Sequence, residues 1–222
     1  MAIGGYRHAA DLPQVIPVFP LDGVLLLPHG MLPLNIFEPR YLNMIDDAMA
    51  GDRMIGMIQT QAGMGDDHAR PPLAQIGCAG RITSYAETPD GRYLITLTGV
   101  CRFRAGPELP VQTPYRQIRA AFAPFEQDLG EGEPEAPGVD RPALLDALKC
   151  YLEHRGLDVD WKMAGEAPLE ALVNSLSMAL PFDQAEKQAL LEAETLQARL
   201  QALTALLRIG AADDEDSPHQ VQ

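Results

Sequence analysis

The chain has 222 residues, of which 46% are hydrophobic, enough for one large domain or two small ones with an ordinary core. Its formal net charge is −14, but the segments 126–140 and 211–222 carry six and four acidic residues and no lysine or arginine. The remainder is close to neutral, which disfavours a nucleic-acid partner, because binding to a phosphate backbone needs a surplus of positive charge.

The N-terminus has no positively charged start leading into an apolar run, and no apolar stretch reaches about 18 residues. Three cysteines, Cys78, Cys101 and Cys150, are widely spaced among apolar neighbours, a pattern typical of buried thiols in a reducing compartment. We therefore expect a cytoplasmic protein with no membrane segment.

Short apolar runs broken by proline and glycine open the chain, at 15–21, 24–28 and 31–36. They favour β-strands, and their prolines favour sheet edges or bulges. A helix is then predicted to begin at Pro39, because proline at the first helical position loses no needed hydrogen bond, and to end near Gly51.

A buried strand is predicted at 54–58, followed by a surface loop at 62–72. Alternating apolar residues at 74–87 and 93–97 flank a Pro-Asp-Gly turn, which predicts a hairpin, and 115–125 is one more strand candidate. About six strands with one helix indicate a closed or nearly closed β-barrel.

The Gly-, Pro- and Glu-rich segment 126–140 cannot bury enough apolar surface to order itself, and we interpret it as a flexible acidic linker. Beyond it the apolar spacing is helical, over 144–152, 169–180 and 183–208. Asp183 with Glu186 resembles a capping box that opens the last helix. That helix would be continuous, and its regular seam indicates packing on neighbouring helices or a partner-binding coiled coil.

These elements predict the following organisation: a β-barrel subdomain at 1–125, a flexible acidic linker at 126–140, a helical bundle at 141–210 and a disordered acidic tail at 211–222.

The motifs of common enzyme classes are missing from the sequence. No lysine follows a glycine, as a phosphate-binding loop requires, and none of the four serines stands in a Gly-x-Ser-x-Gly turn. The cysteines and histidines are too scattered for zinc-ligand pairs. The sequence therefore predicts no catalytic residue, no metal and no cofactor.

One basic feature remains. Arg102 and Arg104 share a strand face, and Arg116 and Arg119 lie on the next strand candidate. They form either a solvated sheet face or a docking patch for an acidic partner or RNA.

Four segments carry a family resemblance. They are IPVFPL at 16–21, LPHGMLPLNIFEPRY at 27–41, MIGM at 54–57 and QIGCAGRI at 75–82. Together they resemble the N-terminal substrate-binding domain of Lon proteases, in particular its stand-alone bacterial form, closely over about the first 125 residues and more loosely beyond. The resemblance implies an α+β fold: a PUA-like pseudo-β-barrel of about six strands with one helix, followed by a C-terminal helical bundle.

In Lon proteases this domain precedes an ATPase and a Ser-Lys protease domain and helps to recognise unfolded or tagged proteins. The sequence contains neither catalytic part, so the resemblance implies a non-catalytic polypeptide-binding module. Its expected partners are unfolded or tagged polypeptides, with a separate protease or chaperone, and it would be a monomer or a weak dimer through the last helix. A PUA-like RNA-binding module is the alternative.

The motif Phe37-Glu38-Pro39-Arg40-Tyr41 has two interpretations. It is either a helix start docked on the barrel, with Arg40 in an ion pair, or part of a recognition groove between barrel and helices that uses Arg40 and Tyr41. Phe37, Glu38, Arg40 and Tyr41, together with Arg102 and Arg104, are the predicted binding residues.

Overall fold

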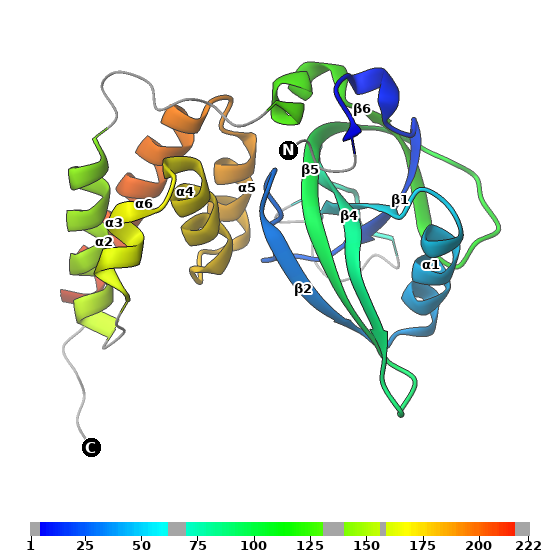
Figure 1. The fold of residues 1–222 in the computed structure, drawn as a ribbon, viewed down its shortest axis with the longest axis horizontal. Coiled ribbons are helices and arrows are strands. Elements are labelled where there is room, and N and C mark those ends of the chain that lie inside the picture. Colours follow the sequence, from blue (N-terminus) through cyan, green and yellow to red (C-terminus); the bar gives the residue numbers. More distant parts are fainter. Residues whose placement is uncertain (1–4, 62–69, 131–139, 156–158, 216–222) are drawn as a thin grey trace.

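The structure, a computed structural model, describes residues 5–61, 70–130, 140–155 and 159–215. A curved sheet with one long helix forms the first part of the chain, and a bundle of helices packs beside it (Figure 1). This is the α+β architecture that the sequence predicts. Among the described residues, no helix is long and apolar enough to cross a membrane.

The first part contains strands β1 to β6, helix α1 and two 3-10 helices, η2 and η3. Their bounds are η2 Ala9–Asp11, β1 Val15–Pro20, β2 Met31–Ile36, α1 Pro39–Ala50, β3 Met54–Ile58, β4 Ile76–Glu87, β5 Tyr93–Glu108, β6 Arg116–Ala121 and η3 Ala123–Leu129.

The sheet has the order β2-β5-β4-β3-β1-β6, and β6 pairs again with the C-terminal part of β5. Of the pairings between the described strands, that of β1 with β3 is the only parallel one. The second β5–β6 pairing curls five of the strands into a ring, but β2 stays outside it on the N-terminal half of β5. The predicted barrel is thus present only as a pseudo-barrel that does not close regularly.

Local signals placed most of these elements correctly. Helix α1 has Pro39 in its first turn and Gly51 at its C-terminal end, and β3 is buried along its length. The strand predicted at 24–28 is wrong, because this segment joins no sheet. Leu25, Leu26 and Leu27 are nevertheless almost fully buried, since the segment crosses between the sheet and the bundle as irregular chain.

The bundle consists of helices α2 to α6. Their bounds are α2 Arg141–Arg155, α3 Trp161–Glu166, α4 Leu169–Ala179, α5 Gln184–Glu192 and α6 Leu196–Glu215. The continuous last helix predicted from 183 to 208 is wrong, because the chain leaves helical geometry at Ala193. The predicted capping box is confirmed: Asp183 accepts from the Glu186 amide, and the Glu186 carboxylate accepts from the Asp183 amide.

The seam of α6 packs inside the bundle. Leu196, Leu200, Leu203 and Leu207 are all buried, and α6 lies along α2. At Gly210 a Cβ atom would come within 2.8 Å of the Tyr151 ring, so the glycine lets the two helices approach closely. This contact and buried Ala211 extend α6 to Glu215, past the predicted end at Arg208.

The boundaries of the predicted linker and tail shift accordingly. Residues 126–129 of the predicted linker belong to η3, and residues 211–215 of the predicted tail belong to α6. The rest of both segments, 131–139 and 216–222, lies outside the described residues, as does most of the predicted loop at 62–72.

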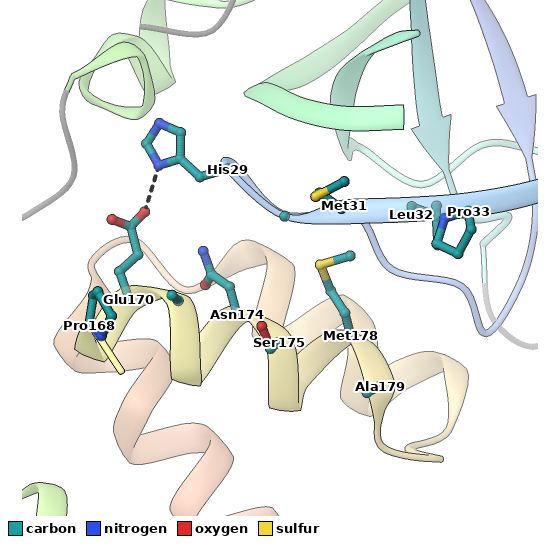
Figure 2. A pocket seen from close by; sticks show the side chains of 12 residues that line it. His29, Met31, Leu32, Pro33, Pro168, Glu170, Asn174, Ser175, Met178 and Ala179 are labelled. Atoms are coloured by element: carbon teal, nitrogen blue, oxygen red, sulfur yellow. Dashed lines mark hydrogen bonds and ion pairs between the residues drawn. The ribbon is translucent and has the colours of Figure 1, made fainter. Parts of the chain in front are cut away.

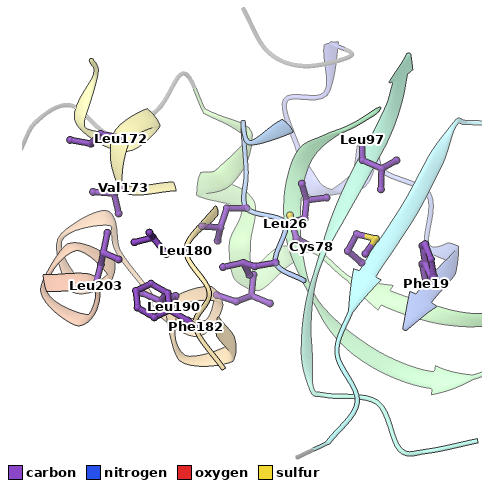
Figure 3. Close-up of a cluster of buried hydrophobic side chains, with 14 of the residues drawn as sticks. Phe19, Leu26, Cys78, Leu97, Leu172, Val173, Leu180, Phe182, Leu190 and Leu203 are labelled. Atoms are coloured by element: carbon purple, nitrogen blue, oxygen red, sulfur yellow. The ribbon is translucent and has the colours of Figure 1, made fainter. Parts of the chain in front are cut away.

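One hydrophobic core spans the sheet and the bundle. Phe19, Leu26 and Leu97 of the first part belong to the same buried cluster as Leu190 and Leu203 of the bundle. Figure 3 shows Leu26 between the strands and the helices. The two parts therefore share apolar packing, which fixes the relation between sheet and bundle.

The cysteines divide into two kinds. Cys78 and Cys101 are buried, as predicted, and burial raises the pKa of both thiols. Cys150 is exposed, so its predicted burial is wrong. It lies on α2 two positions after buried Leu148, which turns it away from the face that packs on α6.

Candidate functional site

Strand β2 is an edge strand. Among the described strands it pairs only with β5, from Met31 opposite Thr98 to Ile36 opposite Tyr93. The Gly99 amide donates to the Gly30 carbonyl, so residue 30 hydrogen-bonds to β5. In an antiparallel pair every second residue hydrogen-bonds to the partner strand, and therefore the N–H and C=O groups of residues 31, 33 and 35 point away from β5. Pro33, which has no N–H, stands in this outward set. The outer edge therefore offers the amides of Met31 and Asn35 and three carbonyls.

The outer edge of β2 borders a groove whose other wall is helix α4 (Figure 2). The groove has a volume of about 570 Å³. Met31, with 66% of its surface exposed, and Met178 lie on facing walls. The lining residues are His29, Gly30, Met31, Leu32, Pro33, Pro168, Glu170, Ala171, Asn174, Ser175, Met178 and Ala179.

The two walls of the groove are in contact where β2 begins. A Cβ atom on Gly30 would come within 2.4 Å of the Met178 sulfur, so the Met178 side chain packs directly against the Gly30 backbone. The lining is mostly apolar, and methionine adapts its shape to different side chains. The groove can therefore accept apolar side chains beside an unpaired strand edge.

An ion pair spans one end of the groove. His29 Nδ1 lies 3.1 Å from Glu170 Oε1, and the two residues join the β2 approach to the first turn of α4. His29 has a φ of 63°, in the left-handed region that few non-glycine residues adopt. The hydrogen bond to Glu170 raises the pKa of His29, against an opposing effect of burial. Protonation of His29 therefore strengthens its ion pair with Glu170.

Buried polar contacts hold α4 in place behind the groove. Asn174 Nδ2 donates to the Pro28 carbonyl over 3.0 Å, and Arg199 Nη1 donates to Asn174 Oδ1 over 3.0 Å. Arg199 Nε also donates to the Leu190 carbonyl. Burial lowers the pKa of Arg199 to about 10, so the side chain stays charged at neutral pH. These contacts fix the spacing between the β2 approach and α4.

A second buried network joins the sheet to the break between α5 and α6. Arg102 binds Asp128 through Nε and Nη2, at 2.9 and 2.8 Å. Its Nη1 donates to the carbonyls of Ala193 and Leu191, at 2.6 and 3.2 Å, where the helix carbonyls would otherwise lack partners. Burial by itself lowers the pKa of Arg102, but Asp128 more than offsets this and raises it.

Arg102 is therefore a structural residue and presents nothing to a partner, although the sequence singles it out for binding. It is 2% exposed, whereas Arg104, two residues on, is exposed to solvent. Arg116, from the same predicted patch, is paired with Glu108, and Arg119 is exposed. The four arginines do not form one free basic surface.

The helix-start motif lies away from the groove. Phe37 is 64% exposed just after β2, while Tyr41 is buried against Phe19 with ring centroids 4.2 Å apart. Arg40 pairs with Glu38 over 2.8 Å and stacks on the Tyr41 ring. Arg40 and Tyr41 line a separate cavity made only of residues before the bundle, so the predicted placement between barrel and helices is wrong.

The residues of the groove itself were missed because they come from two distant segments. His29 and Glu170 are 141 positions apart. A signal was present in Pro33, since proline within an apolar strand marks an edge. A second signal was the less apolar face of the predicted helix, which forms the α4 wall of the groove. On this face Ala171, Ser175 and Met178 recur at helical spacing.

Comparisons with known proteins agree with this architecture. The family model described as the ATP-dependent protease La (LON) substrate-binding domain matches residues 15–208. Among curated proteins, Lon protease 2 of Myxococcus xanthus is 27% identical over 210 residues, which is 93% of this chain and 25% of that protein. Lon protease of Roseiflexus castenholzii is 32% identical over 135 residues, 60% of this chain and 16% of that protein. The chain thus spans about a quarter or less of the relatives it matches.

Two solved structures share the fold. The Lon N-terminal domain protein from Xanthomonas campestris superposes with a TM-score of 0.57 at 21% identity, covering 86% of this chain and 97% of that one. The N-terminal domain of Mycobacterium avium complex Lon protease superposes with a TM-score of 0.58 at 18% identity, covering 87% and 97%.

Proposed function

The chain belongs to the family of LON substrate-binding domains, and from this premise we propose that it is a non-catalytic module that binds polypeptides in the groove between β2 and α4. The observation that carries the proposal is the unpaired outer edge of β2 beside an apolar groove of about 570 Å³. An extended polypeptide would add a strand to this edge, with main-chain hydrogen bonds providing affinity.

The walls of the groove define which polypeptides fit. Alternate side chains of an added strand would point toward α4, where Ala171, Met178 and Ala179 offer an apolar surface. Folded proteins rarely present an unpaired extended segment with apolar side chains, whereas unfolded chains and terminal tags do. Unfolded or tagged polypeptides are therefore the proposed partners, to be passed to a separate protease or chaperone.

The chemistry of the groove supports binding without catalysis. Ser175 lines it, but among the described residues it makes no hydrogen bond to His29 or to any other base. His29 is engaged with Glu170 instead. A serine without a base in reach is a weak nucleophile. The groove therefore has the features of a binding surface and not of a catalytic site.

The test is fluorescence anisotropy with a labelled unfolded polypeptide and three variants. Met31→Pro removes one outward amide without touching the β2–β5 ladder, and proline is tolerated at the start of an edge strand. Met31→Ala is the matched control, because it loses the same side chain but keeps the amide. Ala171→Arg places a charge on the exposed wall of α4.

We expect Met31→Pro to bind the polypeptide more weakly than Met31→Ala does, and Ala171→Arg to abolish most of the binding. Binding should survive physiological salt, because it depends on main-chain and apolar contacts. If all three variants bind like the unaltered chain, the groove is not the binding site. If only a labelled structured RNA binds, and in a salt-sensitive manner, the proposal of a polypeptide partner is wrong.

A further inference from the structure

A second cavity, of about 330 Å³, lies at the start of α1 and is separate from the groove. Three arginines from different segments line it: Arg40 on α1, Arg70 before β4 and Arg116 at the start of β6. Tyr41, Tyr115 and Thr60 complete its polar wall, and prolines close the rest. Three guanidinium groups around one cavity are unusual in a chain with a formal charge of −14.

Two of the three positive charges already have carboxylate partners. Arg40 pairs with Glu38 over 2.8 Å. Arg116 binds Glu108 through both Nε and Nη2, and its Nη1 donates to the Pro71 carbonyl over 2.8 Å. Exposed Arg70 makes no ion pair with any residue in the described parts of the chain. One of the three arginines, Arg70, therefore has no carboxylate partner of its own among the described residues.

Tyr41 adds a free donor. Its ring is buried against Phe19, yet its hydroxyl makes no hydrogen bond to any described residue. The hydroxyl is not sealed in the core, since it is absent from the buried atoms that lack partners, and the residue lines the cavity. Burial raises the pKa of Tyr41, so the phenol remains a hydrogen-bond donor at neutral pH. A donor without a partner beside arginines suits an anionic acceptor.

We propose that this cavity, the arginine pocket, binds a single carboxylate group, with Arg70 and the Tyr41 hydroxyl as its main contacts. Guanidinium groups match the planar shape of a carboxylate. A single arginine without a carboxylate partner favours a monoanion over a phosphate dianion. Asp47, which accepts from the Tyr115 hydroxyl, and Asp22, which binds Thr60, place two further carboxylates behind the walls. The surroundings are therefore not strongly positive as a whole, and they disfavour a dianion more than a monoanion held directly by Arg70.

The size of the pocket limits what can carry the carboxylate. A volume of about 330 Å³ is at the lower end for a small-molecule site and has room for one acid with a modest apolar body against the prolines and tyrosines. Either a free small acid or the last residue of a polypeptide meets this description. Both present the same group to Arg70, and separate probes distinguish them.

Isothermal titration of the full chain at low salt tests the pocket with three small probes. They are N-acetyl-leucine, its amide and inorganic phosphate. We expect the acid to bind, the amide not to bind and phosphate to bind more weakly than the acid. Two copies of one short peptide, with a free and an amidated C-terminus, then separate the sources: a preference for the free terminus assigns the pocket to chain ends, and equal weak binding assigns it to small acids.

Substitutions connect binding to the pocket. Arg70→Gln should weaken binding of the acid about tenfold, the usual effect of losing a charged hydrogen bond. Tyr41→Phe keeps the buried ring and should weaken binding less. Arg208→Gln, at an exposed arginine of α6 outside the pocket, is the matched control and should leave binding unchanged. The Met31→Pro variant of the groove should also bind the acid normally, which separates the two proposals.

Four results would overturn the proposal. They are no binding of the acid at millimolar concentration, equal binding of the acid and its amide, tighter binding of phosphate than of the acid, and an Arg70→Gln variant that binds like the unaltered chain.

Discussion

Arg102 of β5 and Asp128 of η3 form a buried ion pair, with 3% and 7% of their side chains exposed. The same guanidinium reaches the carbonyls at the end of α5. One side chain therefore connects the sheet, η3 and the break between two bundle helices. The position of α4 and α5 relative to β2 depends on such contacts, and so does the width of the groove.

Loss of Arg102 should strongly destabilise the protein. Arg102→Met leaves the Asp128 carboxylate buried without its partner, which costs roughly 3–5 kcal/mol. Replacing both residues, in Arg102→Met with Asp128→Leu, should cost less than Arg102→Met does, because no unpaired charge remains. Urea unfolding measures the stabilities of the unaltered chain, the single variant and the double variant. Arg104→Met serves as the exposed control. A loss below about 1 kcal/mol for Arg102→Met would contradict the structural role.

The His29–Glu170 pair predicts a pH dependence. Glu170 raises the pKa of His29 in the folded protein above the ordinary value of 6.5, so the pair stabilises the fold fully below that value. The stabilisation is lost as the pH rises through the raised pKa. The stability difference between the unaltered chain and His29→Gln should thus be larger at about pH 5.5 than at pH 8.

The size of this effect should be below about 1 kcal/mol, since 32% of the His29 side chain is exposed. Thermal unfolding across the pH range measures it, with Glu170→Gln as the second variant. A difference that grows with rising pH would show that the pair does not stabilise through the protonated histidine.

The capping box should contribute measurably to the bundle. Asp183→Ala removes the acceptor for the Glu186 amide at the start of α5 and should cost about 1 kcal/mol. Asp183→Asn keeps an acceptor at this position and is the matched control. Urea unfolding compares the two variants. Equal stabilities would mean that the hydrogen bond accepted by residue 183 does not stabilise the start of α5.

Thiol reactivity should follow burial. Burial raises the pKa of the Cys78 and Cys101 thiols, and Cys150 is exposed. In the folded chain at about pH 8, iodoacetamide should modify Cys150 first and the other two only after unfolding. Mass spectrometry of the digested protein identifies the modified positions. Early labelling of Cys78 would contradict the packing of β4.

Elements with local signals could be predicted from the sequence. Pro39 marks the start of α1, the Pro-Asp-Gly turn joins β4 to β5, and Asp183 with Glu186 starts α5. Each depends on backbone geometry that neighbouring residues determine. The order of sheet and bundle followed from the change in apolar spacing along the chain, and the resemblance to a known family agreed with it.

The break after Glu192 has a local and a tertiary contribution. The local one was missed: Thr195 caps α6, because the Ala198 amide donates to its hydroxyl. The apolar spacing continues from Leu190 to Leu196 as in one helix, but Arg102 from β5 binds the freed carbonyls at the break. The groove was missed for the same kind of reason, since β2 and α4 meet only in the folded chain. Arg102 itself was misread because an arginine on a strand does not reveal that Asp128 will bury with it.

Pairing of a polypeptide with the outer edge of β2 should be visible in residue-resolved amide hydrogen exchange, measured with and without a saturating unfolded polypeptide. We predict new protection at the amides of Met31 and Asn35, which face away from β5, and little change at Leu32 and Leu34, which already face it. If saturating binding leaves the exchange of the Met31 and Asn35 amides unchanged, the polypeptide does not pair with β2.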